Sequence, residues 1–156
     1  MGLFSRDTAA EPLDSAFAAV VIGTSDSDRA TATALTTRNQ AVIKDLLEHG
    51  EEVVCLARHG TALMDDLYLL VVTNRRTLQM NKKGIIQKQL RHTDVVETWI
   101  GDSAKRGLIV RIYSEASRLD YAQDDPARMA EIIQCAVGTP RVAQAICAAV
   151  DSHLSR

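Results

Sequence analysis

Residues 67–80 read LYLLVVTNRRTLQM, and this stretch decides the class of fold. Two runs rich in strand-forming residues, Leu67–Thr73 and Arg75–Met80, are separated by Asn74, a residue that tolerates the backbone of a tight turn. Two such runs joined by a short polar break are typical of a β-hairpin. The stretch therefore predicts two neighbouring antiparallel strands.

Five further runs of the same kind flank this hairpin at a spacing of roughly ten residues. They are Val53–Ala57, Ile85–Leu90, Val95–Ile100, Leu108–Tyr113 and Arg118–Tyr121. The alternation is clearest where Leu108, Val110 and Ile112 would share one face of a strand. No helix-length segment interrupts the seven runs, so we expect an antiparallel sheet that forms a small barrel or sandwich.

A helical pattern precedes the strands. Gly50 marks its end, since glycine commonly terminates a helix, and the predicted helix covers residues 35–49. Its apolar stripe consists of Leu35, Val42, Ile43, Leu46 and Leu47.

A second helix is expected directly after the seventh strand. Asp124-Asp125-Pro126 combines an aspartate cap with proline at the first helical position, and Gly138 follows as a terminator. The apolar stripe of this helix, suited to closing one end of a barrel, consists of Met129, Ile132, Ile133, Ala136 and Val137. Thr139-Pro140 then predicts an extra C-terminal helix over residues 139–153.

The pattern divides the chain into three parts. Residues 1–34 form a poorly patterned arm, residues 35–137 the barrel with its lead-in helix, and residues 138–156 the extra helix. No window offers the roughly 18–20 apolar residues of a membrane span. The three cysteines, an odd number set in apolar runs, argue against a disulfide framework. We therefore expect a cytoplasmic protein.

The hairpin Thr73-Asn74-Arg75-Arg76 between two apolar strands resembles the corresponding hairpin of bacterial pleckstrin-homology-like domains and of the related GRAM domains. The lead-in Glu51-Glu52-Val53-Val54 and the turn Asn81–Ile85 fit the same pattern, so that the resemblance covers residues 35–137. It implies a mainly β (α+β) fold: a seven-stranded antiparallel barrel capped by a C-terminal helix. The family is functionally mixed, with many members that look like oligomerising or membrane-associated modules.

Signatures of enzymes are absent from the sequence. It contains no G-x-x-x-x-G-K loop, no G-x-G-x-x-G and no G-x-S-x-G elbow. Cys55 and His59 lie four residues apart, but no second pair completes a zinc site. We therefore expect neither catalysis nor a cofactor or metal, and an enzyme of unrecognised type is the third alternative.

Basic residues are concentrated in one part of the chain. Residues 75–111 contain nine basic and three acidic residues, a net charge of +6, and the remainder carries −8 because the whole chain carries −2. Two loops in this stretch are candidate contacts for anions or lipid headgroups through Lys82, Lys83, Lys105 and Arg106. The alternative is that these residues keep exposed strands soluble and unpaired. Arg75 and Arg76 are expected to pair with Asp65 or Asp66.

The two flanking helices exceed what a minimal barrel needs. They either wrap the same barrel or dock on a second subunit, and the candidate interface residues are Val142, Ile146, Ala149 and Val150. The leading prediction is a non-catalytic protein-interaction or assembly module that self-associates through these helices or a barrel edge. The alternative is peripheral binding to anionic lipid at the inner membrane face. Nucleic acid is not expected as a partner, because few aromatic residues accompany the basic ones.

Overall fold

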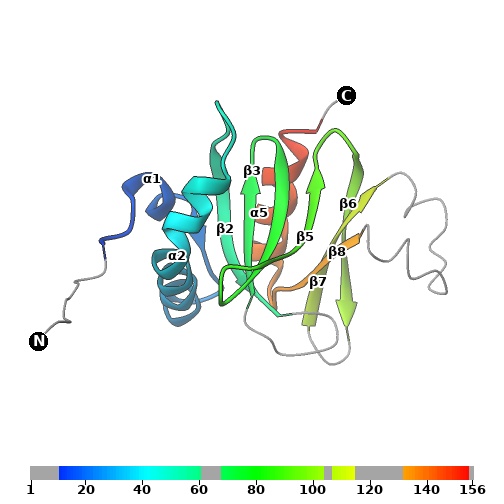
Figure 1. The fold of residues 1–156 in the computed structure, drawn as a ribbon. Helices are drawn as coiled ribbons and strands as arrows, with labels where there is room; N and C mark the ends of the chain where they lie inside the picture. Colours follow the sequence, from blue (N-terminus) through cyan, green and yellow to red (C-terminus); the bar gives the residue numbers. More distant parts are fainter. Residues whose placement is uncertain (1–10, 61–67, 104–106, 115–131, 155–156) are drawn as a thin grey trace, which may run out of the picture.

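The structure is a computed structural model that describes residues 11–60, 68–103, 107–114 and 132–154. These residues form a mixed α+β fold with two sheets (Figure 1). The elements in chain order are α1 (Ser15–Ala18), β1 (Val21–Ile22), α2 (Asp26–Leu46), β2 (Val53–His59), β3 (Tyr68–Thr73), β4 (Arg76–Asn81), β5 (Ile86–Arg91), β6 (Val95–Ser103), β7 (Gly107–Ser114), β8 (Ile132–Ala136) and α5 (Pro140–Asp151).

The first sheet has the strand order β1-β2-β3-β4-β5. Its centre is the predicted β3–β4 hairpin, in which Val72 lies opposite Thr77 and only Asn74 and Arg75 separate the strands. β2 to β5 are antiparallel, whereas the two-residue β1 joins β2 in parallel. Residues 69–72 of β3 are fully buried, because both faces of this sheet are covered.

Helix α2 covers one face of the first sheet. It begins nine residues before the predicted start, because Ser25 caps it by accepting a hydrogen bond from the backbone N–H of Asp28 at 3.1 Å. Leu35 and Ile43 of the predicted stripe are buried against the sheet, whereas Val42 is 39% exposed. Phe17 joins the same cluster, so part of the poorly patterned arm belongs to the core.

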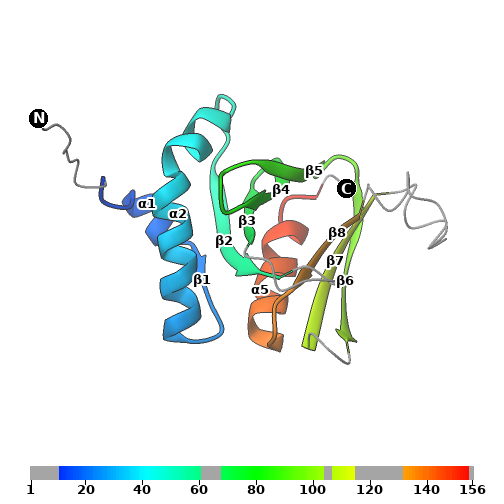
Figure 2. The ribbon, with the colours of Figure 1, turned by 60° about the horizontal axis from the view of Figure 1, so that its bottom comes forward.

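The second sheet has the order β6-β7-β8, and α5 lies between the two sheets (Figure 2). β8 contradicts the prediction of a capping helix through Val137, because Ile132–Ala136 form a strand paired with β7. Isoleucine favours strands, and a strand buried on both faces shows no clean alternation to distinguish it from a helix. The proposed helix start and the strand predicted at Arg118–Tyr121 lie outside the described residues.

The coarse fold prediction is confirmed, but the closed seven-stranded barrel is not. In the described part of the chain the two sheets remain separate, connected by one backbone bridge between Gly60 and Ala136 with N···O distances of 3.0 and 2.9 Å. The predicted C-terminal helix is present as α5, with Pro140 in its first turn. None of the described helices is long and apolar enough to cross a membrane.

Candidate functional site

No group of three or more histidine, cysteine, aspartate or glutamate side chains converges on a possible metal position within the described ranges. All three cysteines are buried. Burial raises the pKa of the Cys55 thiol to about 12 and also raises the pKa of Cys135 and Cys147. Because the thiolate is the reactive form, these thiols are inert near neutral pH.

Arg76 forms a buried ion pair with Glu51, a partner that the sequence pattern did not indicate, and the predicted partners Asp65 and Asp66 lie outside the described residues. Its Nε and Nη2 donate to the carboxylate of Glu51 at 2.9 and 3.0 Å. Arg75 lies 3.5 Å from Glu48, with 43% of its side chain exposed. The Arg76 pair, whose members are 8% and 0% exposed, joins the β3–β4 hairpin to the loop before β2 and is therefore structural.

Lys82 and Lys83 are exposed in the turn between β4 and β5. The Asn81 side chain orders this turn by accepting hydrogen bonds from the backbone N–H groups of Lys83 and Ile85, at 2.9 and 3.0 Å. Gly84 has a positive φ of 82° and packs against α2 so closely that a Cβ there would lie 2.8 Å from an Asn39 oxygen. The turn that carries Lys82 and Lys83 is therefore shaped by the Asn81 side chain and by its contact with α2. Lys105 and Arg106 lie outside the described residues.

An exposed apolar pair accompanies the two lysines. Ile85 is 55% exposed, and Val42 of α2, next to the turn, is 39% exposed. Together Lys82, Lys83, Ile85 and Val42 form a surface that we call the turn patch. The helical periodicity of the sequence did not indicate that Val42 is exposed in this patch, because it assigned Val42 to the buried stripe of α2.

The predicted interface on α5 is not available as a surface. Val142, Ile146 and Val150 are 2%, 0% and 0% exposed, respectively, because α5 packs into the chain's own core, and Ala149 is half-buried against the same cluster. Of the two alternatives for this helix, packing against its own chain or docking on a second subunit, the structure supports the first.

The outer edge of β6 presents a second apolar surface. In the described residues β6 is hydrogen-bonded to β7 alone, so its other edge has no strand partner. Trp99 and Ile100 on this strand are 41% and 37% exposed, and adjacent strand residues point to opposite faces. We call this edge, with Trp99 and Ile100, the β6 edge.

Trp99 is held in place by its own sheet. The Arg111 guanidinium lies 4.7 Å from the centre of the indole ring, and these residues are paired across β6 and β7. The ring also lies over Gly101, where an added Cβ would be 1.8 Å from it. Only glycine fits at this position while the indole keeps its place.

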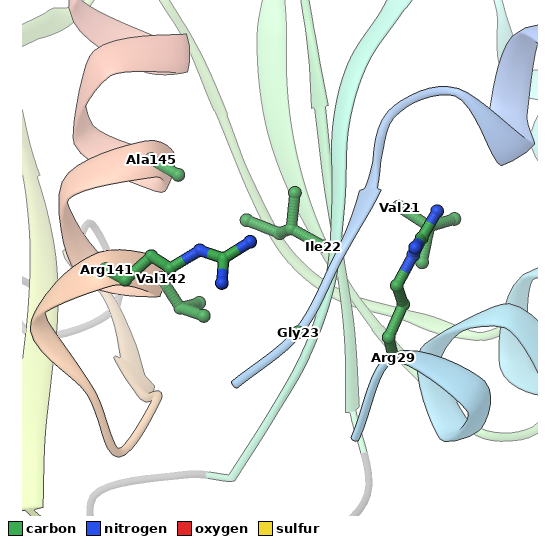
Figure 3. A pocket seen from close by; sticks show the side chains of 7 residues that line it. All are labelled: Val21, Ile22, Gly23, Arg29, Arg141, Val142 and Ala145. Carbon is green, nitrogen blue, oxygen red and sulfur yellow. The ribbon is translucent and has the colours of Figure 1, made fainter. Parts of the chain in front are cut away.

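A pocket of about 120 Å³ lies between β1, the start of α2 and the start of α5 (Figure 3). It is lined by Val21, Ile22, Gly23, Arg29, Arg141, Val142 and Ala145. Arg141 extends from α5 toward Ile22 and Gly23, whereas Arg29 extends along the other side of β1. This pocket was not predictable from the sequence pattern, since neither β1 nor the start of α2 was predicted.

Gly23 allows α2 to approach β1 beside this pocket. A Cβ at Gly23 would lie 2.5 Å from the backbone nitrogen of Arg29, a distance that side chains do not adopt. Because glycine has no side chain, the first turn of α2 can lie this close to β1. Asp28 in the same turn pairs with Arg58 at 3.3 Å and accepts the N–H of Thr24 at 2.8 Å.

A scan against protein-family models and a search of curated proteins both find no match to this chain.

Proposed function

We propose that this chain is a non-catalytic assembly module that self-associates by pairing the β6 edge of two copies. The observation that carries the proposal is the exposure of Trp99 and Ile100 on a nine-residue strand whose second edge has no strand partner among the described residues. Natural edge strands are usually protected by lysine, proline or a covering element, and Val95–Ser103 contains neither lysine nor proline. Pairing would satisfy the unpaired backbone groups and bury both apolar side chains.

A second copy is the occupant that the charges favour. The two ionised residues of β6 are Glu97 and Asp102. In an antiparallel pair centred on Trp99, Glu97 lies opposite Gly101 and Asp102 opposite Val96, so no like charges face each other. Such a contact uses the same surface on both copies and closes as a two-fold dimer.

The finer fold assignment belongs to the same proposal. Four antiparallel strands (β2–β5), three more (β6–β8) and a helix (α5) buried against both sheets agree with the plan of a pleckstrin-homology-like domain. In this interpretation β8 is the seventh strand and α5 is the capping helix. β1 and α2 are then additions that cover the outer face of the first sheet.

The mass in solution tests the assembly proposal. We expect the wild-type chain to have about twice its monomer mass of 17.0 kDa by light scattering. Trp99→Lys should weaken the dimer about 30-fold or more, because a central tryptophan typically contributes at least about 2 kcal/mol to an interface. High salt should leave the dimer intact, since apolar burial and backbone pairing are insensitive to screening.

The matched control for this experiment is Ile85→Lys. Ile85 is the most exposed large apolar residue of the described chain and lies in the turn patch, away from β6. This variant should remain dimeric. A wild-type chain that stays monomeric at every concentration, or a Trp99→Lys variant that dimerises as the wild type does, would refute the proposal.

The turn patch favours a second candidate function, binding to an anionic membrane surface. Two exposed lysines beside an exposed isoleucine offer both electrostatic attraction and a short apolar contact with the headgroup region. The partner in this proposal is a bilayer surface, because the lysines and Ile85 are exposed side by side at the same turn.

Co-sedimentation with phosphatidylserine-containing vesicles tests this second function. Lys82→Glu combined with Lys83→Glu should reduce binding at least about 30-fold, since each basic residue near such a surface contributes about 1 kcal/mol. Arg75→Glu combined with Arg91→Glu changes the net charge equally at the ends of β4 and β5 away from this turn, and should bind as the wild type does. Equal losses in both double variants would indicate a net-charge effect and no specific turn patch.

A further inference from the structure

We propose that the pocket between β1 and α5 binds a phosphate-type oxyanion through Arg141. Arg141 reaches across the pocket toward Ile22 and Gly23 (Figure 3). Among the described residues its guanidinium has no hydrogen-bond or ion-pair partner. A guanidinium presents several N–H donors in a planar fork that matches the oxygens of phosphate.

The surroundings of the pocket carry the same sign of charge. Arg29 is the second cation at the wall, and its guanidinium too has no partner among the described residues. No carboxylate lines the pocket within the described chain, and the nearby Asp28 is already paired with Arg58. The start of α5 adds the positive end of a helix dipole, which acts in the same direction.

Size and lining restrict the ligand class. A volume of about 120 Å³ lies well below the roughly 300–1,000 Å³ of pockets that enclose drug-sized ligands. A tetrahedral oxyanion, either free or as the terminal group of a larger molecule, fits this size. The remaining wall consists mainly of Val21, Ile22, Val142 and Ala145, whose side chains cannot form hydrogen bonds, so that the two exposed arginines supply the charge.

The two arginines have different roles in this proposal. Arg141 enters the pocket from α5 and contacts the anion directly, whereas Arg29 lies along the other side of β1 and contributes through its electric field. Removing the Arg141 charge should therefore weaken binding about tenfold or more, and removing the Arg29 charge about two- to threefold.

The experiment is a titration of the full chain with inorganic phosphate, followed by backbone amide NMR at constant ionic strength. We expect saturable shifts at Gly23, Arg141, Val142 and Ala145, with a dissociation constant in the millimolar range. Arg141→Gln should abolish the saturation and Arg29→Gln should weaken it. Arg38→Gln, an exposed arginine in the middle of α2, is the matched control and should titrate as the wild type does.

Glycerol 3-phosphate in a second arm distinguishes the source of the anion. Tighter binding than inorganic phosphate indicates a phosphate monoester on a larger ligand, and equal or weaker binding indicates the free ion. Both results support the site. Shifts that fail to saturate in the wild type, or that persist unchanged in Arg141→Gln, would overturn it, independently of whether the chain dimerises through the β6 edge.

Discussion

Replacing Arg76 with methionine is expected to lower the free energy of unfolding by about 3–5 kcal/mol, because it leaves the buried Glu51 carboxylate without its cation. Glu51 is fully buried, and besides Arg76 it accepts hydrogen bonds from the Thr73 hydroxyl at 2.6 Å and the Glu48 N–H at 2.9 Å. Arg76 also donates to the Leu46 carbonyl and, at 3.1 Å, to Gln89. One side chain thus connects α2, the loop before β2, the hairpin and β5.

The acidity of Glu51 is consistent with this dependence. Burial alone would raise the pKa of Glu51, but the hydrogen bonds from Arg76, Thr73 and the Glu48 N–H, together with the Arg76 charge, lower the pKa below its ordinary value. A carboxyl group with a lowered pKa in the folded state stabilises the fold above its unfolded pKa, and this contribution is lost as the pH falls. Methionine at position 76 should therefore reverse the shift and raise the pKa of Glu51.

Urea unfolding of matched variants tests the prediction. Arg75→Met removes the neighbouring arginine, whose exposed pair with Glu48 is worth at most about 1 kcal/mol. The double variant Arg76→Met with Glu51→Leu should recover much of the loss, since an apolar pair can replace a buried ion pair. If Arg76→Met lowers the free energy of unfolding no more than Arg75→Met does, then the buried pair does not stabilise the fold as described.

The β3–β4 hairpin was predictable because its signals are local. The apolar runs, Asn74 and the strand alternation all lie within one short stretch, and the structure reproduces them. The partner of Arg76 was not predictable in the same way, because Glu51 is 25 residues away and competes in sequence with the nearer Asp65 and Asp66. Which carboxylate pairs with Arg76 depends on how α2 folds onto the sheet.

Two elements were missed for different reasons. The start of α2 lies in a polar stretch whose only local signal is the Ser25–Asp28 cap, and Ala32 is the one buried residue of this helix before Leu35. Residues 132–136 carry an apolar pattern that fits either a helix stripe or a fully buried strand, and only pairing with β7 decides between them. Local pattern cannot resolve such cases.

The candidate sites depend on contacts that a linear pattern does not encode. Trp99 was visible in the sequence, but its position on an open edge follows from the strand order β6-β7-β8. The pocket beside Arg141 requires a two-residue strand, β1, to pair in parallel with β2. Conversely, the apolar stripe of α5 was read correctly, and only its partner, the chain's own core, needed the structure.

Acidification is expected to destabilise the fold between about pH 6.5 and pH 4, before most carboxylates titrate. His59 is fully buried, its ring stacks on Tyr68 at a centroid distance of 5.6 Å, and its Nδ1–H donates to the Gly60 carbonyl at 2.6 Å. Its Nε2 has no partner among the described residues. Burial lowers the pKa of His59 to about 4, and burial likewise lowers the pKa of His92 to about 4.

The direction and size of the effect follow from linkage. In the unfolded chain each histidine binds a proton near pH 6.5, whereas in the folded chain it does so only near pH 4. The contribution of the neutral histidines to the free energy of unfolding is therefore fully present above pH 6.5 and is lost as the pH falls. For His59 the loss between pH 7.5 and pH 5 amounts to about 2 kcal/mol. His59 lies next to the Gly60–Ala136 bridge, so its protonation would destabilise the backbone connection between the two sheets.

Urea unfolding at half-unit pH steps measures this slope. His59→Phe keeps a ring against Tyr68 but cannot titrate, so its stability should fall about 2 kcal/mol less than that of the wild type between pH 7.5 and pH 5. His49→Gln, at an exposed position, should keep the wild-type slope. A wild-type slope retained in His59→Phe would show that His59 does not contribute to the pH dependence, and would refute the prediction.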